Sequence, residues 1–221
     1  MCYMIRKLFV CSLLMLLLIP TIVQSAQLQP RWTLEMNAGM FEPEADNWSS
    51  YYGSKRMYAV GGSVAYRLLY VLDLGMSVDY AQDRGTGSLP ISGIQSGKVT
   101  YRILPVDLYA LLRLRFTEGQ WLVPYAGGGY TRFAYHISTS GQDATRGSVN
   151  GYHARAGLQL LLDPLDKGSA KEMLRSYGAI NSYLYFEVKR SRAEANSAIQ
   201  GDPAIQLGGY SFKSGLMVEF R

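Results

Sequence analysis

Eight segments of this sequence alternate between apolar and polar residues, and all but one of them are about ten or more residues long. In the first segment Trp32, Leu34 and Met36 are apolar, whereas Thr33 and Glu35 between them are polar. A period of two is typical of β-strands that have one apolar and one polar face. The apolar positions of the eight segments run from Trp32 to Met40, Tyr58 to Tyr66, Leu72 to Tyr80, Val106 to Leu114, Trp121 to Tyr135, Tyr152 to Leu162, Leu184 to Val188 and Tyr210 to Phe220. The pattern therefore predicts an all-β chain.

The connections between these segments alternate between long and short. The short connections are 68–71 and 117–120, and the long polar ones are 42–55, 82–97, 138–150 and 191–205. Long loops on the outside and tight turns in the periplasm are typical of a transmembrane barrel. We therefore predict an eight-stranded antiparallel up-and-down transmembrane β-barrel whose termini are both periplasmic.

One connection departs from this alternation, because residues 163–180 stand where a short periplasmic turn is expected. Within this insert Ala170, Met173, Leu174 and Tyr177 recur at helical spacing, and Gly178 follows them as a stop signal. We predict one short amphipathic periplasmic helix tucked under the barrel mouth. An ordered surface loop is the alternative.

Residues 1–25 have the zones of a secretory signal peptide. Basic Arg6 and Lys7 precede an apolar run over 8–19, and small residues follow. The run is shorter than the roughly 20 residues that a spanning helix needs, which argues against an uncleaved anchor. We expect this segment to be removed during export, leaving 26–221 as a single outer-membrane barrel domain.

Removal of the leader changes what the composition implies. Cys2, Cys11 and two of the 22 Lys and Arg residues lie in the leader, so the mature chain has no cysteine and a net charge of 20 − 17 = +3. A disulfide scaffold, a cysteine-based zinc site and a cysteine nucleophile are therefore excluded for the mature chain. The basic residues form no runs, which argues against a nucleic-acid partner.

The polar face of the predicted strands carries nearly balanced charges, whereas the apolar face carries none at the strand centres. Eight strands enclose an interior that side chains can fill, and buried charges must be paired. We therefore predict a charge network in the lumen and no open pore. Its acids are Glu35, Asp73, Asp79, Asp107, Glu187 and Glu219, and its bases are Arg67, Arg102, Arg113, Arg132, Arg155, Lys189 and Lys213.

The apolar face has the composition that lipid selects. Leu, Val, Met and Ala fill its centre, and aromatic residues lie near the strand ends, as in the two girdles of membrane barrels. The predicted girdle residues are Trp32, Tyr58, Tyr66, Tyr80, Trp121, Tyr135, Tyr152, Tyr210 and Phe220.

These features together resemble the small outer-membrane β-barrels, the superfamily that includes outer-membrane proteins A, W and X, over residues 30–221. The stretches 124–130 and 183–187 are similar to those of an uncharacterised family of bacterial outer-membrane barrels. The resemblance implies an assembly signal read by the barrel-assembly machinery, formed by alternate residues near the chain end: Tyr210, Phe212, Leu216, Val218 and Phe220. Arg221 departs from the pattern, because the family usually ends on the aromatic residue.

The hydrophobic pattern also predicts a bulge at Pro105, since the apolar residues are odd-numbered before it and even-numbered after it. The two histidines, His136 and His153, fall on the predicted inward face. With Asp79 they form a candidate metal site, but two histidines joined by a loop are weak evidence, and the favoured interpretation is that they are rim residues bonded to water or neighbours. His136 and Ser138 also resemble the H-x-S pair of barrel-borne lipid A deacylases, but no Glu follows to orient the histidine.

These observations favour an integral outer-membrane protein with a structural or surface-interaction role, in contact with outer-membrane lipid, monomeric and without a cofactor. Trp48, Tyr51 and Tyr52 make the first long loop the best candidate contact surface. The alternatives are a narrow channel or binder for small hydrophobic molecules and, less favoured, a lipid acyl hydrolase.

Overall fold

The computed structural model describes residues 30–44, 56–85, 99–117, 119–139, 144–195, 205–206 and 208–221. The leader and the aromatic residues of the first long loop lie outside the described residues. Nothing in the structure therefore bears on the predicted cleavage or on that contact surface.

Eight strands form one closed antiparallel barrel, as the alternation predicts. Each strand pairs with the next along the chain, β9 pairs with both β1 and β7, and β6 pairs with β7. A two-residue strand, β8, adds only to the end of β7. The strands are β1 (Trp32–Pro43), β2 (Met57–Leu69), β3 (Leu72–Gly85), β4 (Val99–Arg113), β5 (Leu122–Thr139), β6 (Thr145–Leu161), β7 (Ala179–Ala195), β8 (Ile205–Gln206) and β9 (Gly209–Phe220).

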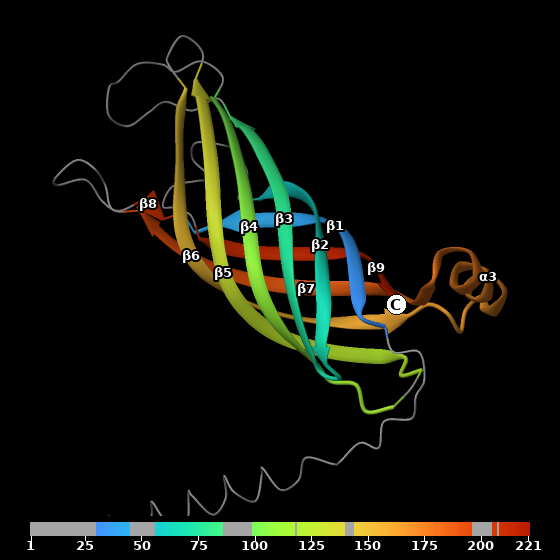
Figure 1. Cartoon of the computed structure of the whole chain (residues 1–221). Coiled ribbons are helices and arrows are strands. Elements are labelled where there is room, and N and C mark those ends of the chain that lie inside the picture. The colour runs from blue at the N-terminus through green and yellow to red at the C-terminus, as the bar shows by residue number, and fades with distance from the viewer. Residues whose placement is uncertain are drawn as a thin grey trace, which may run out of the picture.

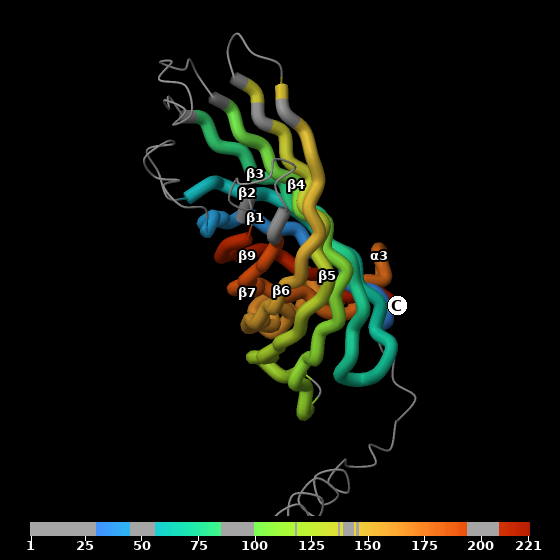
Figure 2. The backbone as a smooth tube through the Cα atoms, turned by 90° about the vertical axis from the view of Figure 1, so that its left-hand side faces the viewer, coloured from blue at the N-terminus to red at the C-terminus, as the bar shows by residue number. Residues whose placement is uncertain are grey.

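The barrel wall is strongly twisted. In Figure 1, β1, β7 and β9 cross the direction of β3, β4 and β5 at a steep angle. Figure 2 shows β3 to β6 rising past the ends of β1 and β9, away from the end of the barrel where the C-terminus lies. The rim that carries the long connections is therefore higher on the side of β3 to β6.

The outside of the wall is apolar. Leu34, Met36, Leu108 and Leu216 are each at least half exposed, which a lipid environment explains. The predicted girdle residues that lie within strands point outward with one exception, Tyr135, which faces the interior and packs against a buried cluster, and Trp121 is exposed just before β5. No helix in the described part of the chain is both long enough and apolar enough to cross a membrane.

The predicted orientation of β5 is wrong, and so is the predicted bulge in β4. Val123, Tyr125 and Phe133 point inward, not outward, and β4 keeps one register on both sides of Pro105. Both faces of β5 carry apolar residues, so hydrophobicity alone did not reveal which face is inside. In β4 the apolar Tyr101 and Ile103 face the lumen, and this produces the apparent change of parity without a bulge.

The predicted helix in the insert is confirmed as α3 (Lys167–Tyr177). The Asp166 carboxylate caps its N-terminus by accepting hydrogen bonds from the backbone N–H groups of Gly168 and Ser169, and Gly178 ends it in the left-handed conformation with φ 71°. The Ser169 hydroxyl and these two N–H groups hold the pKa of Asp166 below its usual range. Figure 1 shows α3 beyond the strand ends, and none of its residues is buried, so the helix does not sit tucked under the barrel mouth.

Candidate functional site

The lumen holds most of the predicted charge network. Eleven of the thirteen predicted residues are buried inside the barrel: Glu35, Asp73, Asp79, Asp107, Glu187, Glu219, Arg67, Arg113, Arg155, Lys189 and Lys213. Arg115, which lies just past the end of β4, joins them through its ion pair with Glu219 and was not predicted. The sequence feature that could have identified Arg115 is its spacing, because it lies two residues after the inward-facing Arg113 and so falls on the same face of the chain. With Arg115 the charge network has six acidic and six basic side chains among the described residues.

The predicted lumen positions of Arg102 and Arg132 are wrong. Both side chains are exposed on the outer face of the wall, Arg102 on β4 and Arg132 on β5. Arg132 is outward because β5 has the opposite orientation to the predicted one, and Arg102 is outward because β4 has no bulge at Pro105. Arg132 donates a hydrogen bond from Nη2 to Oγ of Ser148, at 3.1 Å, on the same outer face.

A first charge cluster lies at the end of the lumen nearest the short turns. Arg113 reaches across the lumen, with its Nε 2.8 Å from Oδ2 of Asp73 and its Nη2 3.3 Å from Oε1 of Glu35. Arg67 Nη2 lies 2.6 Å from Oε1 of Glu219, which Arg115 also contacts. These side chains come from β1, β2, β3 and β9 and from the end of β4, so the cluster ties most of the wall together.

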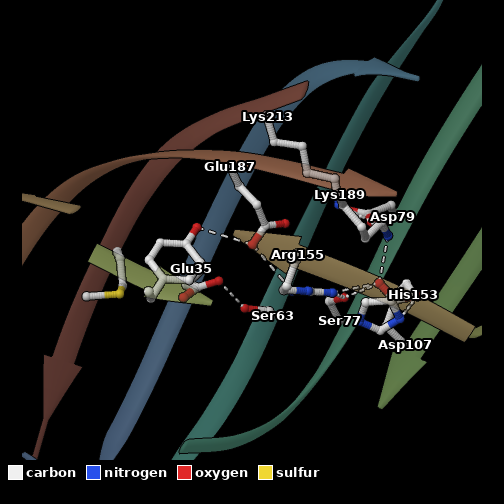
Figure 3. A network of polar contacts seen from close by, with 12 residues as sticks. Glu35, Ser63, Ser77, Asp79, Asp107, His153, Arg155, Glu187, Lys189 and Lys213 are labelled. Atoms are coloured by element: carbon white, nitrogen blue, oxygen red, sulfur yellow. Dashed lines mark hydrogen bonds and ion pairs between the residues drawn. The ribbon is translucent and has the colours of Figure 1, made fainter. Parts of the chain in front are cut away.

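A second cluster is centred on Asp107, whose carboxylate is fully buried. Its Oδ2 lies 2.7 Å from Nζ of Lys189 and 2.8 Å from Nη2 of Arg155, and its Oδ1 accepts a hydrogen bond from Thr131. Lys189 and Lys213 reach across the lumen from β7 and β9 and both contact Asp79 on β3, the strand next to the one that carries Asp107. Figure 3 shows these side chains converging from separate strands.

Tyrosine rings and glycines fill the space between the two clusters. Arg155 lies 4.2 Å above the ring of Tyr109 and reaches Glu187, which also accepts a hydrogen bond from the Tyr125 hydroxyl. A Cβ atom at Gly75 would lie 2.5 Å from Cζ of Tyr109, so only glycine leaves room for this ring. Aromatic rings therefore pack directly against the charge network.

The outer half of the lumen is apolar, which the sequence analysis missed. A cluster of buried side chains fills it, with Met57, Ile103 and Phe133 each 1% exposed. We call these residues the apolar layer: Phe41, Met57, Ala59, Ala81, Tyr101, Ile103, Phe133, Val149 and Ala193. The lumen thus contains a charged layer toward the short turns and an apolar layer toward the long loops.

The candidate metal site does not form. His153 points into the lumen, where its Nδ1 lies 2.7 Å from Oγ1 of Thr131, whereas His136 lies on the outer face of β5. The two histidines are therefore on opposite sides of the wall. Among the described residues no three His, Cys, Asp or Glu side chains are grouped as a metal site would require.

The geometry of His136 does not suit an acyl hydrolase either. A catalytic histidine donates its Nδ1 proton to an orienting carboxylate. Here Nδ1 of His136 instead accepts a hydrogen bond from Nε of Arg146, at 3.0 Å. Ser138 lies exposed on the same outer face of β5.

The five residues of the predicted assembly signal, Tyr210, Phe212, Leu216, Val218 and Phe220, all point to the outside of β9. This strand pairs with β1 and so closes the barrel. Their apolar side chains form a stripe on the lipid-facing wall.

The family model for the outer membrane protein beta-barrel domain matches residues 11–165. No curated protein sequence matches the chain. Among solved structures, Neisserial surface protein A is 13% identical with a TM-score of 0.57, over 86% of this chain and 97% of the other. The outer membrane protein OprG from Pseudomonas aeruginosa is 10% identical with a TM-score of 0.60, over 87% of this chain and 96% of the other. At these identities the two structures support the fold alone.

Proposed function

This chain belongs to the outer membrane protein β-barrel family, and from that membership we propose that it is a closed barrel of the cell outer membrane with a structural and surface-interaction role. The observation that carries the proposal is the filling of the lumen by two successive layers. Arg113, Asp107 and Lys189 cross the charged layer, and Ile103 and Phe133 fill the apolar layer beyond it. Under this proposal the two layers together exclude water and ions from the lumen.

The chemistry of the lumen favours a structural role over a transport role. The lumen of a water-filled channel carries hydrated charges, whereas the charged side chains of this lumen form ion pairs with one another. What is left for contact with other molecules is the outer wall and the rim with the long connections. We propose lipid as the partner of the wall and a monomer as the working unit.

Planar-bilayer recording tests the closed lumen. Protein extracted from the outer membrane should give no steady single-channel conductance. Large and steady openings of the unmodified barrel would refute the proposal. An Arg113→Ala barrel, which loses the side chain that spans the charged layer, is the comparison that should remain closed because the apolar layer is intact.

One observation favours a second candidate, a binder of small hydrophobic molecules that enter from the outer side. The apolar layer faces the outer mouth and includes Met57, whose flexible side chain can rearrange around a guest. Titration with a fluorescent alkyl probe distinguishes the two functions. Binding that is abolished by Ile103→Gln but unaffected by Glu172→Gln on α3 would favour the binder.

A further inference from the structure

Arginines stand on the outer wall at the level where its apolar band ends. On β4 the outward residues are apolar from Leu112 to Leu104, and the next outward residue is Arg102. On β5 the outward face is uncharged from Leu122 to Tyr130, and the next outward residue is Arg132. This is the height at which lipid tails give way to headgroups.

Arg146 on β6 completes the group together with His136. Arg102 pairs in register with His136, and His136 pairs with Arg146, so these three side chains form one row across β4, β5 and β6. Side chains directly opposite one another in such a pairing lie about 5 Å apart at Cβ. We call Arg102, Arg132, Arg146 and His136 the basic girdle.

No carboxylate neutralises the basic girdle from the described outward positions of its own three strands. Beyond the band these positions carry only Thr100, Ser138, Ser148, Asn150 and the small residues Ala134 and Ala144. On the neighbouring strand β7, by contrast, Arg190 pairs with Glu44 at 3.2 Å. Within the girdle Arg146 contacts His136, and Arg132 contacts Ser148, and neither contact brings a negative charge.

We propose that the basic girdle binds the phosphate groups of the anionic glycolipid in the outer leaflet. Guanidinium groups match phosphate oxygens in pairs, and Ser148 and Asn150 supply further hydrogen bonds at the same level. A phosphate is favoured over a carbohydrate because Arg102 and Arg146 flank His136 in one cross-strand row, and Arg132 adds a third guanidinium four residues away on β5. The proposal rests on the outer-membrane position of the barrel but not on the closure of its lumen.

Native mass spectrometry of the protein extracted from the outer membrane tests the proposal, with bisphosphorylated lipid A and the same lipid without phosphates as probes. Each arginine near an anionic lipid surface contributes about five-fold to affinity. The triple variant Arg102→Gln, Arg132→Gln, Arg146→Gln should therefore bind the phosphorylated lipid roughly 100-fold more weakly. Its binding of the dephosphorylated lipid should not change.

The matched control is Lys167→Gln, Lys171→Gln, Arg175→Gln, which removes the same charge from the exposed face of α3 at the other end of the barrel. This control should bind both lipids as the unmodified protein does. Equal losses in the two triple variants, or equal binding of the two lipids by the unmodified protein, would overturn the proposal. A gel shift between unheated and boiled samples verifies that each variant is folded, and Arg102→Lys, Arg132→Lys, Arg146→Lys should recover part of the lost affinity.

Discussion

At the scale of single residues, the Asp107 carboxylate lies at the centre of the polar contacts in the lumen. Its two carboxylate oxygens contact Lys189, Arg155 and Thr131, and the residue has no exposed surface. Removal of one partner from a buried ion pair leaves the others without compensation and costs several kcal/mol. The stability of the barrel should therefore be more sensitive to this carboxylate than to any exposed acid.

We predict that Asp107→Asn lowers the free energy of unfolding by about 3 kcal/mol, because Arg155 and Lys189 lose the charge they share. Urea titration in detergent micelles, followed by gel mobility without heating, measures the loss. Glu172→Gln is the control, since Glu172 lies exposed on α3 and accepts only from Ser176. A loss of equal size in both variants would show that the pairing around Asp107 is not what stabilises the barrel.

A second residue-scale prediction concerns Gly75. An added methyl group would meet the ring of Tyr109, which cannot move freely because Arg155 covers it at 4.2 Å. Gly75→Ala should cost about 1–3 kcal/mol, the usual price of overpacking. In a Tyr109→Ala background the same substitution should cost almost nothing, and a double-mutant cycle by urea titration compares the two values. Equal costs in both backgrounds would contradict the steric explanation.

At the scale of elements, the predictability of each strand depended on how different its two faces are. In β1 the outward Leu34 and Met36 contrast with the inward Glu35, so periodicity gave the correct orientation. In β5 the inward Tyr125 and Phe133 are as apolar as the outward residues, so the pattern had two solutions. Only the pairing with β4 and β6 selects one of them.

The charge network shows the same dependence. The eleven lumen charges were predictable because lipid excludes unpaired charges from the outer face of the band. Arg102 and Arg132 escaped this rule because they lie beyond the band, where charge is tolerated. The apolar layer was not predictable in the same way. In the outer part of the strands an apolar residue can face either the lumen or the lipid, so hydrophobicity does not distinguish the two faces.

The helix α3 provides a prediction on pH. The depressed pKa of Asp166 means that its ionised form stabilises the folded helix, so this stabilisation is fully present above about pH 4 and is lost as the pH falls through the lower folded-state value. Hydrogen exchange measured by mass spectrometry should show that residues 167–177 lose protection in acid before the strands do.

Asp166→Asn separates the charge from the cap. Asparagine caps helices about as well as aspartate but does not ionise, so the variant should keep a protected helix whose protection no longer changes across the acidic range. Asp166→Ala should lose protection at every pH. An unchanged acid response in Asp166→Asn would assign that response to another group.

At the scale of the whole molecule, charge is sorted by depth and by face. The charge network of the lumen combines six acidic with six basic side chains, the wall beside the lipid is apolar, and the basic girdle lies outside the apolar band. Because each region has a separate physical task, changes in one should leave the others intact. Under the proposed function, closure of the lumen depends on two layers that share no residue.

We therefore predict that closure fails only when both layers are damaged. Asp107→Asn loosens the charged layer, and the pair Ile103→Ala, Phe133→Ala opens a void in the apolar layer, but either change alone leaves the other layer to exclude water. The combined triple variant should conduct steadily in planar bilayers, whereas its two parent variants should remain silent. Leu108→Ala on the lipid-facing side of β4, added to Asp107→Asn, is the control and should also remain silent. Steady conductance in the Asp107→Asn barrel alone would show that the charged layer is the only seal, and silence of the folded triple variant would show that other side chains close the lumen.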